Sequence, residues 1–278
     1  LHIHQIQLHN TRLQYADAPG GQNLQLYLDK AALTFNRLDL NRSVFDLNRL
    51  LLENGQISLD LYTPDSLLLA TIPQPNAPPP NTTTQTPAMQ ALIGNLNAQG
   101  ICLNYTDHTQ NPANNGGIDP ANLSVNDFET AITNLRYAGD TIQLQLQQLA
   151  FAEHSGFVCK QLGASVQYTP KGVTLSDLVF ETPKSVIKAD FLAHYPNTDA
   201  FTNQHDSVTL ALNLPQLQLH EQDLFLLYPD VKSYHLLKPA NATLTAQTNL
   251  SGTLGNLLLQ NTQVQLGNNT VKAKTIAL

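Results

Sequence analysis

Hydrophobic and polar residues recur along the chain in an eight-residue unit, best seen at Leu144-Gln145-Leu146-Gln147-Gln148-Leu149-Ala150-Phe151. Positions one, three, six and eight are apolar, and the middle pair is polar. On a helix these four positions scatter around the axis, so no apolar face forms. On a strand, one extra residue at the polar pair, taken up by a β-bulge, keeps all four side chains on one face. The unit therefore predicts bent, one-sided strands.

Six further copies carry the same spacing. They begin at Leu1, Leu33, Phe45, Phe157, Val173 and Leu212, and their polar pairs are His4-Gln5, Asn36-Arg37, Asn48-Arg49, Lys160-Gln161, Ser176-Asp177 and Pro215-Gln216. Their intervals are irregular, whereas leucine-rich repeats keep a period of about 20–29 residues, so a solenoid of that kind is excluded. We expect an all-β fold: an elongated, curved, mostly antiparallel sheet with a groove-like face and at most one short helix, near Gln222–Tyr228.

The chain divides into four segments. Residues 1–70 form a first β repeat, with strands expected at 1–8, 11–16, 24–28, 31–40, 44–52 and 56–62 and turns at Gly20-Gly21 and Asn54-Gly55. The Asn-Gly pair is a strong hairpin signal. Residues 71–90 are proline-rich and predict a linker or loop. Residues 91–205 form a second β repeat and a meander, and 206–278 hold further strands that continue beyond the segment. The two repeats match at an offset of 90, where Ala91, Ile93, Leu96 and Ala98 repeat Leu1, Ile3, Ile6 and Leu8.

Composition and charge make some classes of partner unfavourable. Charged residues make up 13% of the chain and the formal net charge is −7, which disfavours nucleic acid as a partner and docking on an anionic membrane by charge alone. No apolar run reaches the roughly 20 residues that span a bilayer, and no signal peptide is visible. We interpret the chain as part of a longer protein with its anchor elsewhere. Cys102 and Cys159 are predicted to be small buried hydrophobic residues, and a bridge between them stays open if the compartment is oxidising.

Few residues have the type and spacing of a metal-binding or catalytic site. His2, His4 and His9 lack a fourth ligand and a second shell, and Asp107, His108 and Asp119 lack the acidic spacing of a calcium loop, so no metal site is predicted. Asp17 and Asp107 are expected to close turns. The sequence has no phosphate loop, nucleophile elbow or paired-cysteine motif. We predict neither an enzyme nor a cofactor.

Several stretches resemble the AsmA-like and TamB-like proteins of Gram-negative envelopes, especially their long Bacteroidetes members. They are Ile6–Asp17, Ser155–Phe157 with Leu162, Tyr168–Gly172 and Leu175–Thr182, and Leu250–Leu257. The resemblance implies a periplasmic protein held in the inner membrane by a segment outside this chain. It further implies an apolar β-groove for phospholipid acyl chains, a role in outer-membrane biogenesis, a barrel protein as partner, and no catalytic residues.

Three hypotheses remain after this comparison. The first is a lipid groove, the second a closed β-sandwich adhesin or structural envelope protein with an ordinary core, and the third a glycan hydrolase, which would need paired carboxylates. The alternation of apolar and polar residues is the same in a strand that lines an open groove and in a strand that lines a closed core. The candidate groove residues are Leu144, Leu146, Leu149, Phe151, Phe157, Leu162, Val166, Tyr168, Val173, Leu175, Leu178, Phe180, Ile187, Phe191 and Tyr195.

Overall fold

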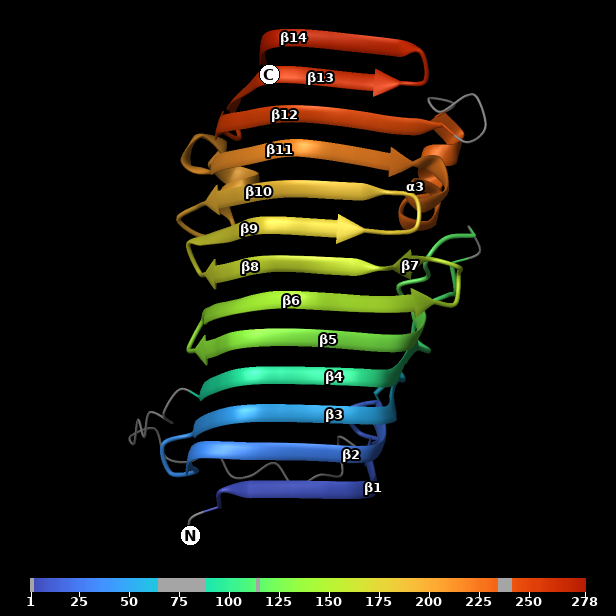
Figure 1. The fold of residues 1–278 in the computed structure, drawn as a ribbon, viewed down its shortest axis with the longest axis vertical. Coiled ribbons are helices and arrows are strands. Elements are labelled where there is room, and N and C mark those ends of the chain that lie inside the picture. Colours follow the sequence, from blue (N-terminus) through green and yellow to red (C-terminus); the bar gives the residue numbers. More distant parts are fainter. Residues whose placement is uncertain (1–2, 65–88, 114–115, 235–241) are drawn as a thin grey trace.

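A single 14-stranded sheet makes up almost all of the protein (Figure 1). The computed structural model describes residues 3–64, 89–113, 116–234 and 242–278. The strands are β1 (Gln5–Asp17), β2 (Gln22–Asp39), β3 (Val44–Leu61), β4 (Gln90–Asp107), β5 (Asn122–Ala138), β6 (Thr141–Glu153), β7 (Val158–Cys159), β8 (Gln161–Thr169), β9 (Gly172–Glu181), β10 (Val186–His194), β11 (Thr209–His220), β12 (Thr243–Thr253), β13 (Asn256–Leu266) and β14 (Asn269–Ala277).

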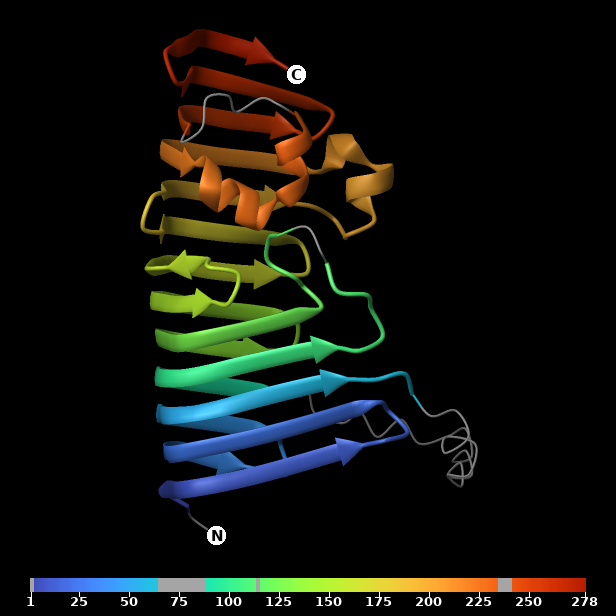
Figure 2. The ribbon, with the colours of Figure 1, turned by 90° about the vertical axis from the view of Figure 1, so that its right-hand side faces the viewer.

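The strands follow one another across the sheet in chain order, and β7 pairs with β6 beside that path. Every neighbouring pair is antiparallel except β3 and β4, which run parallel. β1 and β14 therefore form opposite edges of an elongated sheet (Figure 1). In the side view the long strands double back, so that two limbs of the sheet overlap (Figure 2). The predicted all-β, curved and mostly antiparallel sheet is confirmed.

Helix is confined to short segments: α2 (Ala200–Asn203), α3 (Glu221–Leu227) and the 3₁₀ turns η1 (His205–Ser207) and η2 (Pro229–Tyr234). α3 lies where the sequence predicts a short helix. Its first turn is capped by the His220 ring, which accepts a hydrogen bond from the Gln222 backbone N–H. The single turn of α2 is additional to the prediction.

The strands are longer than predicted, because three expected boundaries lie inside strands. The sequence predicts six short strands in residues 1–62, but these residues form the three long strands β1, β2 and β3. The prediction of a hairpin at Asn54-Gly55 is wrong. Asn54 does adopt the left-handed conformation (φ 48°) that such a turn requires, but the chain bends there within β3 and continues in the same direction. Gly20-Gly21 does lie in a turn.

Most polar pairs of the eight-residue units lie at bulges, as predicted. In β6, Gln148 pairs with Ala131 and Leu146 with Ile132, which leaves Gln147 as the extra residue. The register also shifts at Asn36-Arg37, Asn48-Arg49, Ser176-Asp177 and Pro215-Gln216. At Lys160-Gln161 the ladder breaks between β7 and β8. For His4-Gln5 the prediction is wrong, because β1 pairs with β2 there without a shift.

The bends line up from strand to strand. Six of the seven non-glycine residues with positive φ lie inside strands as the second member of a polar pair: Asn10, Asn54, Asp127, Asn134, Asp177 and Asn261. Asn and Asp tolerate this conformation better than other side chains. Asn54 lies beside Gly100 (φ 62°), where an added Cβ would be 2.5 Å from the Asn54 Oδ1. Such rows of bends curve the whole sheet.

The three β segments belong to this one sheet, with the second repeat joined to the first through the parallel β3–β4 pair. The proline-rich segment 71–90 lies outside the described residues, apart from its last two positions.

Candidate functional site

One face of the sheet is apolar from edge to edge, and we call it the inner face. In β1 to β8, direct cross-strand partners form a row: Ile6, Leu33, Leu50, Leu96, Ile132, Leu146 and Ala164. A second row runs from β6 to β14: Leu144, Val166, Leu175, Phe191, Leu212, Leu250, Leu259 and Ile276. Because directly paired residues project to the same side, the two rows share a face.

The sequence-predicted residues come together on this face. Tyr168 pairs with Val173, and Leu162 pairs with Phe180, which in turn pairs with Ile187. Leu178 pairs with Ala189, and Phe151 pairs with Cys159. Phe157 joins the group through ring contacts, with centroids 6.1 Å from Phe151 and 6.3 Å from Phe180. Leu149 pairs with the buried Thr130, whose hydroxyl donates to the Gln148 carbonyl.

Exposure distinguishes this face from an ordinary core. Of the 15 candidate residues, 13 are half-buried, whereas Phe157 and Tyr195 are 3% and 5% exposed. Tyr195 packs against Ala200 and Val208 beneath α2 and η1, and its ring lies 5.0 Å from that of Phe201. Half of the buried hydrophobic residues in the described part of the chain are alanines. The large apolar side chains of the inner face are therefore partly accessible.

The bends make the inner face concave. Leu28, Ala31, Ala98 and Ile101 form a buried cluster on β2 and β4, beside the bend at Gly100. Leu26, Leu52, Ile57, Leu103 and Phe128 pack against it. Ile101 is only 1% exposed. Apolar side chains on the two sides of the bend thus contact one another, and we call the bent inner face the trough.

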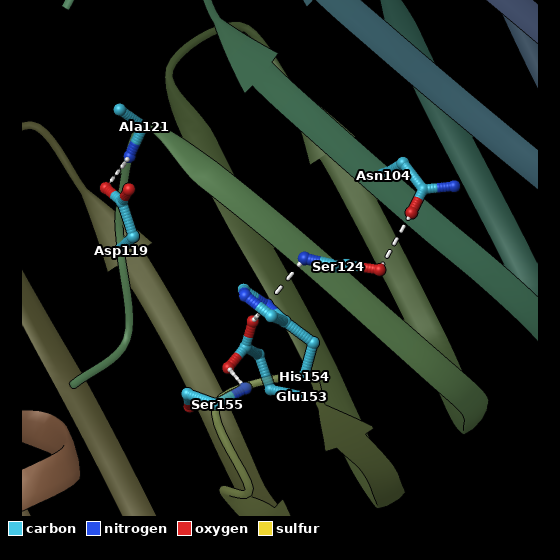
Figure 3. A network of polar contacts seen from close by, with 7 residues as sticks. All are labelled: Asn104, Asp119, Ala121, Ser124, Glu153, His154 and Ser155. Atoms are coloured by element: carbon cyan, nitrogen blue, oxygen red, sulfur yellow. Dashed lines mark hydrogen bonds and ion pairs between the residues drawn. The ribbon is translucent and has the colours of Figure 1, made fainter. Parts of the chain in front are cut away.

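A buried acidic side chain lies at the end of β6, at one end of the inner face. Glu153, at the end of β6, is 4% exposed and accepts hydrogen bonds from the Ser155 backbone N–H at 2.7 Å and the Ser124 N–H at 3.5 Å, with the His154 ring at 2.6 Å (Figure 3). Burial alone would raise the pKa of Glu153, but hydrogen bonds from Ser155, His154 and Ser124 outweigh burial and lower it. The charged carboxylate thus ties β5 and β6 to the turn after β6.

A second polar group fastens α3 to the turn between β9 and β10. The Asp223 carboxylate accepts hydrogen bonds from Thr182 Oγ1 at 2.6 Å and Ser185 Oγ at 2.5 Å. Ser185 Oγ accepts from the His220 backbone N–H, and the His220 ring caps α3. Although Ser, His and Asp meet here, the buried serine donates to the aspartate rather than to the imidazole. This arrangement positions a helix and has no activated nucleophile.

The aspartates that the sequence analysis considered as turn residues or metal ligands accept hydrogen bonds within turns. Asp17 accepts from the Gly20 N–H, and Asp107 accepts from Thr109 and Gln110, as expected. Asp119 accepts from the N–H groups of Ala113 and Ala121 (Figure 3 shows the second). Over the described ranges, no group of three His, Cys, Asp or Glu residues could hold a metal ion. Cys102 is half-buried, Cys159 is buried, and both are free.

Comparisons with protein-family models, with curated proteins and with solved structures find no match for this chain. No helix in the part of the chain that the structure describes is long and apolar enough to cross a membrane.

The sequence contains more bend units than its apolar spacing revealed. Leu26–Leu33, Leu50–Ile57, Leu96–Leu103, Leu123–Thr130 and Leu257–Val264 have the same spacing, but most were hidden by a threonine or glycine at an apolar position. A second signal marks most of them, because the second residue of the polar pair is Asn, Asp or Gly with positive φ. Accepting Asn, Asp or Gly at that position in place of a complete apolar set would have found all of them except Leu26–Leu33, where Lys30 occupies the position.

Proposed function

We propose that the chain is a non-catalytic lipid-binding element whose trough holds phospholipid acyl chains. The observation that carries this proposal is the continuous, half-buried apolar inner face. Exposed apolar patches larger than a few hundred Å² are rare on monomers and mark interaction surfaces. A flexible acyl chain fits a long, shallow apolar trough because it needs area and no directional partners.

The proposal extends to the cellular context that the sequence resemblance implies. We place the chain in the bacterial periplasm, as part of an inner-membrane-anchored protein that passes phospholipid towards the outer membrane and acts in outer-membrane biogenesis with a barrel protein. What supports this is the resemblance together with the elongated, curved sheet and its apolar trough. Neither nucleic acid nor a cofactor enters the proposal.

The closed-sandwich alternative fits less well, because a sandwich buries its apolar face fully between two layers, whereas 13 of the 15 candidate residues are only half-buried. For a glycosidase, paired carboxylates would have to stand about 5–9.5 Å apart in a cleft. Glu153, Asp107 and Asp223 are instead occupied by backbone and side-chain donors.

The decisive experiment replaces Leu175 by Asp, with Phe180→Asp as a second variant. Leu175 is half-buried near the middle of the trough, so water can reach a carboxylate there. In a closed core, the unpaired charge would cost several kcal/mol and unfold the domain. We expect both variants to keep their fold and to lose crosslinking to a phospholipid with a photoreactive acyl chain. Gln167→Asp, an exposed position in the neighbouring strand β8, is the matched control and should crosslink normally.

The measurement combines thermal unfolding with crosslinking for each variant. Unfolding of Leu175→Asp and Phe180→Asp alone would identify a closed core and reject the trough. Normal crosslinking in both folded variants would place the lipid elsewhere and also reject the proposal.

A further inference from the structure

The inner face carries different aromatic residues at the two ends of β6. Phe151 lies near the C-terminal end of this strand, whereas Tyr137, Ile142 and Tyr168 are direct cross-strand partners at its beginning. Ile142 lies two residues before Leu144 and therefore on the same face, so the two tyrosines continue the apolar surface of the trough. A tyrosine combines an apolar ring with a polar hydroxyl, which suits the boundary between an apolar surface and water.

A hollow lies at this end of the inner face, between the β5–β6 turn and the β8–β9 turn, which are on the same side of the sheet (Figure 1). Its lining residues are Tyr137, Gly139, Asp140, Ile142, Tyr168 and Pro170. The volume of the hollow is about 400 Å³, within the range of roughly 300–1,000 Å³ that is typical of small-molecule sites. Both tyrosines are half-buried and Asp140 is exposed. None of the ion pairs in the described part of the chain involves Asp140.

We propose that this hollow binds the ammonium group of a zwitterionic phospholipid and is the headgroup site of the trough. Organic ammonium ions are attracted to the faces of aromatic rings and to carboxylates. Tyr137 and Tyr168 supply the rings, and Asp140 supplies the carboxylate. The inference deepens the proposed function and rests on it for the source of the ammonium group, because acyl chains along the inner face would place a headgroup at its end.

The charges beside the hollow fit a zwitterion better than an anion. Among the described residues, Asp140 is the one carboxylate that lines the hollow. Lys171 is exposed and follows Pro170 in the β8–β9 turn. A headgroup with an ammonium and a phosphate group has a partner of opposite charge for each, whereas an anionic headgroup would be repelled by Asp140. We therefore expect a preference for phosphoethanolamine or phosphocholine over phosphoglycerol.

The first test measures the binding of choline to the intact chain by saturation-transfer NMR, with its uncharged carbon analogue dimethylbutanol as the control probe. We expect choline to bind more tightly, because the two molecules share a shape and differ in charge. Asp140→Asn should weaken choline binding by up to about fivefold, the typical range for an exposed ion pair. The turn position is exposed, so this variant should fold normally. Glu129→Gln, at an exposed position of β5 outside the hollow, should change nothing.

The tyrosine rings are tested separately. Tyr168→Leu should weaken choline binding about twofold to fivefold, as expected for the loss of one exposed cation–π contact. Tyr168→Phe keeps the ring face and should bind choline almost normally. Thermal unfolding of each variant shows whether a loss of binding comes from a loss of fold. Choline binding no tighter than that of dimethylbutanol, or unchanged in folded Asp140→Asn and Tyr168→Leu, would overturn the ammonium site.

The second test compares phosphatidylethanolamine and phosphatidylglycerol that carry the same photoreactive acyl chain. We expect stronger crosslinking to phosphatidylethanolamine, and we expect Asp140→Asn combined with Tyr168→Leu to lose this preference but not the crosslinking itself. Equal crosslinking of the unaltered protein to both lipids would overturn the headgroup assignment. Crosslinking to neither lipid, with choline still bound, would reject the lipid-binding function and assign the hollow to a free ammonium solute. The two failures are therefore distinguishable.

Discussion

At the scale of single residues, buried carboxylates at strand ends work as hydrogen-bond acceptors for turns. Glu153 is the best example, since its acceptor atoms serve the N–H groups of Ser124 and Ser155 at the end of β6. A buried carboxylate is costly unless its charge is matched by donors, and here the donors are sufficient to lower its pKa. The folded state therefore prefers the ionised form.

This preference makes the stability depend on pH. The pKa of Glu153 lies below its ordinary value of 4.5 in the folded protein. The contribution of the ionised carboxylate to the free energy of unfolding is therefore complete above that ordinary value, and it is lost as the pH falls through the folded pKa. Glu153→Gln should cost about 1.5–3 kcal/mol near neutral pH, the typical range for a hydrogen bond to a charged group. The deficit should shrink in acid.

Urea unfolding at neutral pH and below pH 4 would check this expectation, with the exposed Glu129→Gln in neighbouring β5 as control. A deficit that stayed constant with pH would show that the charge of Glu153 contributes nothing.

At the scale of strands, the bend unit is the recurring element. Its polar pair supplies one extra residue, and the second member often adopts positive φ. In β9 this residue is Asp177 (φ 55°), whose backbone N–H donates to Asp190 Oδ1 of β10 at 2.8 Å. That hydrogen bond is the first cause of the lowered pKa of Asp190. Neighbouring bends thus support one another across the sheet.

The conformation at Asp177 predicts an unusual order of substitutions. Asp177→Gly should be nearly neutral, because glycine adopts positive φ without cost. Asp177→Val should lose about 1–2 kcal/mol or more, because a side chain branched at Cβ clashes in the left-handed region. Strand propensity alone would predict the opposite order, with the valine variant more stable than the glycine variant. The urea unfolding midpoints of the two variants therefore distinguish between these two expectations. A valine variant as stable as the glycine variant would show that no left-handed residue is needed.

How far the sequence predicts the fold is clearest at these bends. Spacing alone identified the bulge at Gln147-Gln148, because four apolar residues must reach one face. It failed at Asn54-Gly55, because a left-handed Asn serves a hairpin turn and a bend within a strand equally well. What distinguishes them is the next strand: Gly55 pairs with Leu28 on one side and Ile101 on the other. Such partners are distant in sequence and invisible to local patterns.

At the scale of the whole molecule, the protein is one continuous sheet that is bent on itself (Figure 2). The accessible surface of the whole chain is 17528 Å², against about 11,800 Å² expected for a compact monomer of this mass. Alternation predicted which side chains share a face, but openness depends on whether a second layer covers that face. Leu175 would alternate identically in a sandwich, so its half-buried state could be learned only from the three-dimensional structure.

The linear order of strands in the sheet also predicts how the protein unfolds. Each long strand packs against its immediate neighbours in the sheet, as in a repeat protein, so stability is a sum of neighbour terms with little coupling between distant parts. Thr262→Pro should remove a ladder hydrogen bond and a 2.8 Å contact with Thr248 in the interior of the sheet. We expect amide hydrogen exchange to accelerate in β12 to β14 while β2 to β4 keep their protection.

The reciprocal variant, Ala98→Pro in β4, should expose β3 to β5 and spare β12 to β14, because no strand of one group touches the other. Hydrogen exchange followed by mass spectrometry resolves these segments in the intact chain. A compact domain with one shared core would lose protection everywhere in both variants, since its unfolding is cooperative. Uniform loss would therefore contradict unfolding by separate groups of neighbouring strands.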